Sequence, residues 1–279
     1  MIIAVEQSAD RIRLIAIEMK GAFGNEGALR FFAERPDCHE MFRRFLTVGA
    51  CLAGIVIVGL ALCFFGIWIP NAPSRSQYPV RGIDVSHHQG PIDWAAVKAS
   101  GIQFAYIKAT EGANFTDATF ADHWKNSSAA GIVRGAYHFF TLGTSGDLQA
   151  AHFIATVPAD ADDALPPAID LEFSGFNKDR RPSAEEFQRE FAIFWDAVVA
   201  HYRKVPVVYT ASDFQKQYLR FMPVERLWIR EIVLRPDSGW TFWQFSARGR
   251  VRGIPGFVDL NVFQSSAEEF AKLAQPSHN

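Results

Sequence analysis

The chain has 279 residues, a mass of 31.2 kDa and a formal net charge of −2. This length accommodates one large domain with a smaller appendage. The balanced charge argues against a nucleic-acid-binding protein, which usually carries a basic stripe. The three cysteines, Cys38, Cys51 and Cys63, all lie near the N-terminus. The rest of the chain therefore has neither a disulfide nor a thiol nucleophile.

Residues 1–40 mix charges evenly and show only weak helical periodicity, and we expect residues 1–44 to form a small N-terminal cytoplasmic segment. Within it, Met41-Phe42-Arg43-Arg44 resembles a natural translation start, because a methionine and two cations directly precede an apolar run. An alternative hypothesis is therefore that Met41 is the true start and that residues 1–40 are an extension.

Residues 45–69 form an uncharged apolar run, FLTVGACLAGIVIVGLALCFFGIWI. A helix of this length crosses the hydrocarbon core of a bilayer. More arginines precede the run than follow it, which predicts a cytoplasmic N-terminus and an extracytoplasmic main domain. The arginines in question are Arg30, Arg35, Arg43 and Arg44 before the run, and Arg75 and Arg81 after it. We predict a single-pass signal-anchor of the cytoplasmic membrane. The alternative is a signal peptide cut near residues 71–73, which would release a secreted protein.

Residues 70–79 are rich in proline and serine and are typical of a linker. From residue 80 onward, short apolar runs alternate with stretches of helical period. We expect five strands, each followed by a helix. The strands are at 81–86, 104–110, 133–140, 167–173 and 205–210, and the helices that follow them are at 91–100, 120–130, 145–156, 183–203 and 213–221. Three further strands, at 226–230, 241–246 and 258–263, have no helix between them.

This pattern predicts an α/β fold over residues 80–265, a TIM-like (β/α) barrel of five βα units plus three further strands. Residues 266–279 are expected to form a C-terminal helix or tail. The alternative architecture is a doubly wound parallel sheet. Polar residues recur at the ends of nearly every predicted strand, and this favours the barrel, where the active site gathers at that face.

The stretch LPPAIDLEF, residues 165–173, carries the clearest chemical signal. Asp170 and Glu172 are separated by one residue, so on a strand they point to the same face, about 6–7 Å apart. Two acids at a strand end suit glycosidic cleavage, since one can protonate the leaving oxygen while the other supports positive charge on the sugar. The spacing falls between the retaining and inverting geometries and does not choose between them.

Eight segments, in this order, resemble those of the family 25 glycoside hydrolases, the Chalaropsis-type lysozymes or 1,4-β-N-acetylmuramidases. They are GIDVSHHQGPIDW (82–94), FAYIKATEG (104–112), GIVRGAYHFF (131–140), LPPAIDLEF (165–173), VPVVYT (205–210), LWI (227–229), WTFWQFS (240–246) and IPGFVDLNVF (254–263). The resemblance implies cleavage of the β-1,4 bond between N-acetylmuramic acid and N-acetylglucosamine in peptidoglycan. It assigns Glu172 as general acid and Asp170 as an assisting carboxylate that stays ionised. It also suggests a retaining route in which the substrate's own acetamido group attacks the sugar.

The resemblance further places Asp84 and Asp259 in the substrate cleft. Each has a structural alternative, a turn cap for Asp84 and an ion pair with Arg252 for Asp259. Lys108 and Glu111 can be either a structural ion pair or contacts at the rim of the cleft.

Four more residues are candidates for substrate binding. Tyr137 and Tyr209 stand at strand ends, where a phenol can hydrogen-bond the acetamido group, although core packing is the alternative for both. Trp243 and Gln244 resemble the family's Trp-Gln pair, and the indole is expected to be a platform for a sugar ring.

His87, His88 and His138, together with Asp84, invite a metal-site interpretation. Adjacent histidines usually point apart on regular backbone, so we expect no metal and no cofactor. The chain also departs from the family after Trp228-Ile229, where Arg230-Glu231-Ile232 replaces a small residue and an aromatic one.

Two other function classes stay open. One is a non-catalytic peptidoglycan-binding or glycan-binding barrel, and the other is a metal-dependent polysaccharide deacetylase or amidase. The expected partners are peptidoglycan glycan strands and the membrane, through residues 45–69, and we expect a monomer.

Overall fold

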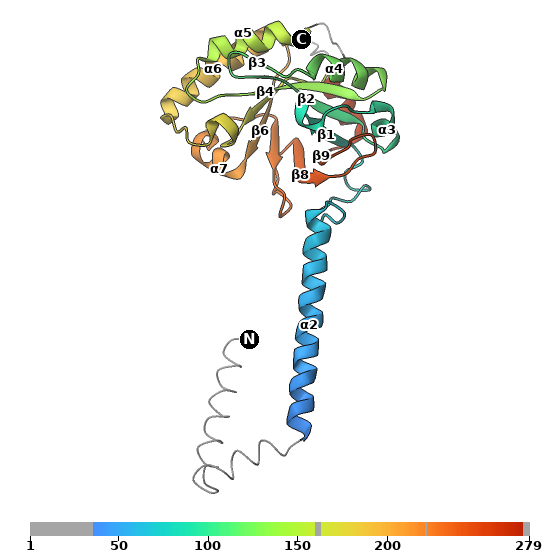
Figure 1. The fold of residues 1–279 in the computed structure, drawn as a ribbon. Helices are drawn as coiled ribbons and strands as arrows, with labels where there is room; N and C mark the ends of the chain where they lie inside the picture. The colour runs from blue at the N-terminus through green and yellow to red at the C-terminus, as the bar shows by residue number, and fades with distance from the viewer. Residues whose placement is uncertain (1–35, 160–162, 221, 276–279) are drawn as a thin grey trace. The chain divides into compact units, whose positions relative to one another are not determined.

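The computed structural model describes residues 36–159, 163–220 and 222–275. Contacts divide the chain into two compact units, Met1–Ala61 and Leu62–Asn279, and the second contains every strand described (Figure 1). The predictions for residues 1–40, a cytoplasmic segment or an extension preceding Met41, lie almost entirely outside the described residues.

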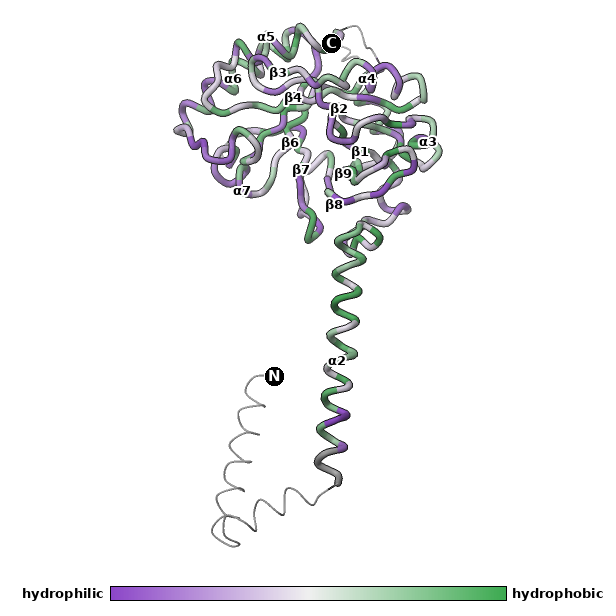
Figure 2. Tube along the Cα trace, viewed as in Figure 1, coloured by the Kyte–Doolittle hydropathy of each residue, from purple (hydrophilic) through white to green (hydrophobic). Residues whose placement is uncertain are grey.

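Helix α2, Pro36–Phe64, begins before the predicted apolar run and ends five residues before that run does. Gly66 is left-handed, with φ 66°, and Ile67 N–H donates to Leu62 O at 2.9 Å. This is a glycine-terminated C-cap, and it stops the helix although the sequence stays apolar. Within Glu40–Phe64, a stretch of 18 residues has a mean hydropathy of 2.5 (Figure 2). Helix α2 is the one helix among the described residues that is long and apolar enough to cross a membrane.

Eight strands close into a barrel, so the predicted TIM-like α/β fold is confirmed. In order around the barrel they are β1 (Arg81–Val85), β2 (Phe104–Glu111), β4 (Val133–Phe139), β5 (Ala168–Leu171), β6 (Val207–Ala211), β7 (Leu227–Arg230), β8 (Phe242–Gly249) and β9 (Val258–Phe263). Neighbouring strands are parallel except at β9, which runs antiparallel to both β8 and β1. Because the strands from β1 to β8 are parallel, their C-terminal ends meet at one face of the barrel.

Helices cover the outside of the barrel (Figure 1). They are α3 (Trp94–Ala99), α4 (Phe120–Ala129), α5 (Gly146–Thr156), α6 (Ala184–Tyr202), and α7 (Ser212–Phe214) with the π turn η3 (Gln215–Leu219). The C-terminal helix α8 (Ala267–Ala274) instead packs its buried Phe270 against Phe104 and Phe263 of the barrel interior. A short strand, β3 (Phe115–Thr116), forms a hairpin with the end of β2. The helix expected over 213–221 is thus one short turn followed by a wider one. The described segments that join β7, β8 and β9 contain no helix.

The barrel interior is filled by aromatic side chains, among which Tyr106 stacks on Trp228 with centroids 4.8 Å apart. Two glycines, on the strands β1 and β4 that flank β2, make room for these rings. A Cβ on Gly82 would lie 2.3 Å from the Phe104 ring, and one on Gly135 would lie 2.4 Å from Tyr106. The interior is therefore packed at this level, and a substrate can only approach from the end of the barrel.

Residues 70–79, predicted to be a linker, pack against the barrel. The side chain of Tyr78 is only 3% exposed, and its ring centroid lies 5.6 Å from that of Trp240. Proline and serine suggest a free segment, but burial of this aromatic ring attaches the segment to the second unit.

Candidate active site

The site is built by inward-facing positions two residues apart on successive strands. On β2, the buried side chains of Phe104 and Tyr106 are followed by Lys108 at the C-terminal end of the inward row. On β5, Ala168 is followed by Asp170, and on β6, Val207 is followed by Tyr209. Since alternate residues of a strand share a face, each inward row changes from apolar to polar at the same end of the barrel.

A cavity of about 350 Å³ opens at this end. Five of the predicted site residues line it, namely Asp84, Tyr137, Asp170, Glu172 and Asp259. Strands β1, β4, β5 and β9, or the residue that follows β5, carry these groups. With Glu111 of β2, which also lines the cavity, the structure gathers five carboxyl groups around it from segments that are far apart in the sequence.

Asp84 and Asp259 form a carboxyl pair. They lie directly opposite each other in the register of β1 and β9, and their side chains are hydrogen-bonded to each other. Burial, then the neighbouring charge of Asp259, raises the pKa of Asp84 well above its usual value. Burial likewise raises the pKa of Asp259 to about 6. The pair therefore tends to hold a shared proton, because two ionised carboxylates in contact repel.

Asn261 supports this pair and was not predicted from the sequence. Its side chain is fully buried, its Nδ2 donates to Asp84 Oδ1 at 2.7 Å, and its Oδ1 accepts from Trp228 Nε1 at 2.8 Å. The sequence does contain a feature that could have predicted Asn261. It lies two residues after Asp259, so both side chains are on the inward face of β9.

Asp170 is buried, and its Oδ1 has no hydrogen-bond partner. Burial, then the charge of Glu172, raises the pKa of Asp170 well above its usual value, although Lys108 opposes this. Lys108 itself is held by Glu111, with Nζ 2.6 Å from Oε2. Both of these residues line the cavity and also form an ion pair. The prediction that Asp170 stays ionised therefore meets an opposing cause, because burial favours the neutral carboxyl and, among the described residues, Oδ1 has no donor that would compensate it.

Glu172 lies directly after β5, partly buried at the cavity wall. Ser174 Oγ donates to Glu172 Oε1 at 2.6 Å, and Asn177 Nδ2 donates to the Glu172 carbonyl at 3.2 Å. Asn177 also accepts from Leu142 N–H at 2.7 Å and donates to Phe140 O at 2.7 Å. This fully buried amide therefore ties the loop after β5 to the loop after β4 and fixes the backbone that carries Glu172.

Tyr137, Tyr209 and Gln244 lie at the same end of the barrel. Tyr137 lines the cavity, and burial followed by the charges of Asp84 and Asp170 raises its pKa well above 10. Tyr209 is buried behind it and donates its hydroxyl to Gln244 Oε1 at 2.7 Å. Gln244 in turn hydrogen-bonds Asp259. Tyr209 and Gln244 therefore do not line the cavity themselves. They are connected to it by hydrogen bonds that lead to Asp259.

Trp243 does not lie at the cavity. Its side chain is 1% exposed and packs on the outer side of the sheet with Tyr78, Trp240 and Phe245. Neighbouring residues of β8 point to opposite faces, so Gln244 faces inward and Trp243 faces outward. A sugar platform needs an accessible ring, and we therefore exclude Trp243 from the site.

His138 is separated in space from His87 and His88. The rings of these two lie together, with centroids 4.0 Å apart, so the expectation that adjacent histidines point apart is wrong here. His138 is fully buried outside the barrel, between Thr110 Oγ1 at 2.7 Å and Gln149 Oε1 at 3.2 Å. His87 instead pairs with Asp117, with Nδ1 2.8 Å from Oδ2. The four-ligand arrangement considered above would need His138 to leave its pocket.

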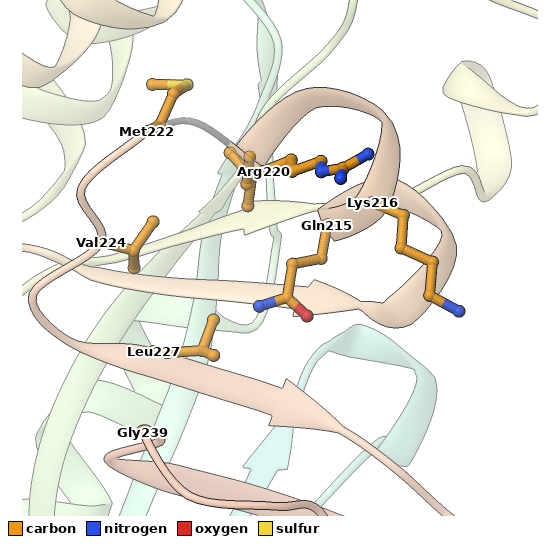
Figure 3. A pocket seen from close by; sticks show the side chains of 8 residues that line it. Gln215, Lys216, Arg220, Met222, Val224, Leu227 and Gly239 are labelled. Carbon is orange, nitrogen blue, oxygen red and sulfur yellow. The ribbon is translucent and has the colours of Figure 1, made fainter.

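A second cavity, of about 620 Å³, lies between η3 and β7 (Figure 3). Lys216 and Arg220 supply its cationic groups, and its remaining lining is amide or apolar, as at Gln215 and Leu227. None of its described lining residues carries a carboxyl group. Because a general acid of this kind is a carboxyl group, the first cavity is the candidate active site.

The model of the glycosyl hydrolases family 25 matches residues 83–254. The chain belongs to this family. It is 37% identical over 215 residues to protein YegX of Escherichia coli K12, covering 74% of this chain and 75% of that protein. It is also 37% identical over 209 residues to lysozyme M1 of Streptomyces globisporus, covering 70% and 71%.

Solved structures agree with this assignment. The family 25 glycosyl hydrolase from Bacillus anthracis superposes with a TM-score of 0.69 at 35% identity, over 74% of this chain and 98% of that one. The bacterial lysozyme from Streptomyces coelicolor gives a TM-score of 0.65 at 34% identity, over 71% and 98%. The chain is a glycoside hydrolase, and the resemblance found in the eight sequence segments is confirmed.

Proposed function

We propose that this family 25 enzyme cleaves the β-1,4 bond between N-acetylmuramic acid and N-acetylglucosamine in peptidoglycan, with Glu172 as general acid and Asp170 as assisting carboxylate. The observation that carries the proposal is the cavity in which Asp170 and Glu172 meet the Asp84–Asp259 pair. Relatives named as lysozyme M1 and N,O-diacetylmuramidase support the choice of substrate.

In this proposal Glu172 donates its proton to the glycosidic oxygen as the bond to the anomeric carbon breaks. The carbonyl oxygen of the 2-acetamido group attacks that carbon and forms a cyclic intermediate. Asp170 accepts the acetamido N–H through Oδ1, the buried oxygen that lacks a partner. Such a donor favours the ionised form of Asp170 and offsets the effect of burial on its pKa. Water, deprotonated by Glu172, then opens the intermediate with net retention.

The supporting roles follow from position. Asp84, Asp259 and Tyr137 line the cavity and are proposed to bind the sugar. Tyr209 and Gln244 are proposed to orient Asp259, because one hydrogen-bonded chain joins the three side chains.

We further propose that residues 45–69 act as a signal-anchor, with the N-terminus in the cytoplasm and the catalytic domain, residues 80–265, outside it. Arg43 and Arg44, directly before the apolar run, support this direction. Cleavage near residues 71–73 is the alternative outcome and would release the enzyme. Alkaline extraction of membranes distinguishes an anchored enzyme from a released one, and protease protection then tests the direction of the anchor.

Analysis of the new sugar ends tests the activity directly. Purified peptidoglycan is digested with the full chain, reduced with borohydride and hydrolysed, and we expect reduced muramic acid. Reduced glucosamine would overturn the assigned bond. Acetate or free amines without new reducing ends would indicate a deacetylase or an amidase. Binding without products would indicate a non-catalytic barrel. Glu172→Gln is the control and should bind peptidoglycan without cleaving it.

A further inference from the structure

The loop between β7 and β8 exposes three consecutive large apolar side chains. Val233 is 72% exposed, Leu234 is 70% exposed, and Ile232 is also exposed. The loop projects from the barrel, and its tip is apolar (Figures 1 and 2). Such a run is unfavourable in water unless it binds something. It begins where the sequence departs from the family pattern, at residues 230–232.

The structure holds this loop in its exposed conformation. Glu231 Oε1 accepts from the N–H groups of Val233 and Leu234, at 3.1 and 3.3 Å. The Glu231 carbonyl accepts from the indole of Trp243 at 2.7 Å. Trp243, which is excluded from the sugar site, therefore anchors the loop. The N–H groups of Val233 and Leu234 are thus paired within the loop, which lowers the cost of moving them out of water.

The same loop adjoins the segment that leaves the apolar helix. Asn71 Nδ2 lies 3.5 Å from the Glu231 carbonyl, and the guanidinium of Arg235 lies over the ring of Tyr78 at 5.4 Å. Just before Asn71, Ile67 and Trp68 also expose their side chains. An apolar loop tip and the apolar residues that follow α2 therefore belong to one region of the second unit.

Arginines adjoin these apolar groups. Arg248 Nε donates to the Phe64 carbonyl at 2.6 Å, and Arg250 Nε donates to the Phe65 carbonyl at 2.8 Å. Neither of them, nor Arg235, forms an ion pair with a carboxylate in the part of the chain that the structure describes. Their remaining N–H groups suit phosphate oxygens.

We propose that Ile232–Leu234 inserts into the interface of an anionic bilayer while Arg235, Arg248 and Arg250 bind lipid phosphates, so that the catalytic domain docks on the membrane surface. Charge complementarity to anionic lipid and continuity with the apolar helix favour a bilayer over a protein partner. The proposal rests on the membrane anchoring proposed above. It adds a second attachment, which would limit the rotation of the domain about its anchor.

The test uses the full chain with its native cysteines replaced by serine and one new cysteine, Val233→Cys, labelled with an environment-sensitive fluorophore. The matched control is Leu148→Cys, on α5, where the native side chain is 56% exposed. Each protein is reconstituted into vesicles that contain phosphatidylglycerol and a lipid carrying a quencher near its headgroup. We expect a blue-shifted, quenched signal at position 233 and a water-like signal at 148. Arg248→Gln and Arg250→Gln should each weaken docking about five-fold.

Three outcomes overturn the proposal and separate it from the anchoring. If the protein floats with the vesicles but the label at 233 behaves like the label at 148, the docking is wrong and the anchoring stands. If the label at 233 shifts without lipid quenching, and more so at higher protein density, a second copy of the chain covers the loop. If the protein does not float with the vesicles, both the anchoring and the docking fail.

Discussion

Asp259→Asn is expected to make the enzyme more stable and less active. Burial raises the pKa of Asp259 from 3.8 to about 6. Between about pH 4 and pH 6 the folded chain therefore keeps a proton that the unfolded chain has lost, and stability falls as the pH rises through this window. At about 1.4 kcal/mol per pH unit, ionising this buried carboxyl costs the folded state up to about 3 kcal/mol above pH 6. Asparagine cannot ionise, so the variant avoids this cost.

Urea denaturation of both proteins in the same detergent, followed by tryptophan fluorescence from pH 3.5 to 7.5, measures the difference. The free energies of unfolding should be similar near the acid end, and the variant should gain up to about 3 kcal/mol near neutral pH. Asp196→Asn, an exposed position in the middle of α6, is the control and should show no such gain. Equal stability of wild type and Asp259→Asn at pH 7.5 would refute the reasoning.

Two further variants test the packing around the site. Gly135→Ala places a Cβ 2.4 Å from the Tyr106 ring, so the free energy of unfolding should fall by about 1–3 kcal/mol; an unchanged urea midpoint would contradict the proposed overpacking. Asn177→Ala leaves the Leu142 N–H and the Phe140 carbonyl without partners. The free energy of unfolding should fall by about 2–4 kcal/mol. The rate of backbone amide hydrogen exchange should increase more in the loops after β4 and β5 than in the rest of the barrel. Uniform exchange across the barrel would argue against a local role.

Much of the barrel could be predicted because its signals are local. Short apolar runs ending in polar residues predict the strands, and the pair Asp170 and Glu172 marks the C-terminal end of β5. The closure of the barrel then brings Asp84 and Asp259 to the same cavity.

The missed features depend on tertiary contacts. The sequence cannot say which of two neighbours, Trp243 or Gln244, faces inward, because the register of β8 against its neighbours decides it. Proline and serine around Tyr78 predict a linker, and the sequence does not show that its ring packs on Trp240, which is distant in the chain. Helix α2 ends because Gly66 adopts a left-handed backbone conformation. Hydropathy does not predict this end, because residues 45–69 are apolar throughout.

The rate of peptidoglycan cleavage by Glu172→Gln tests the central claim most directly. The side chain keeps its size and its place beside Ser174 but loses the transferable proton. We predict that kcat falls by about 10²–10⁴ while peptidoglycan binding and the urea midpoint stay unchanged. Glu185→Gln, in the first turn of α6, is the control and should keep the wild-type kcat. A wild-type rate for Glu172→Gln would contradict the assignment of Glu172 as the general acid.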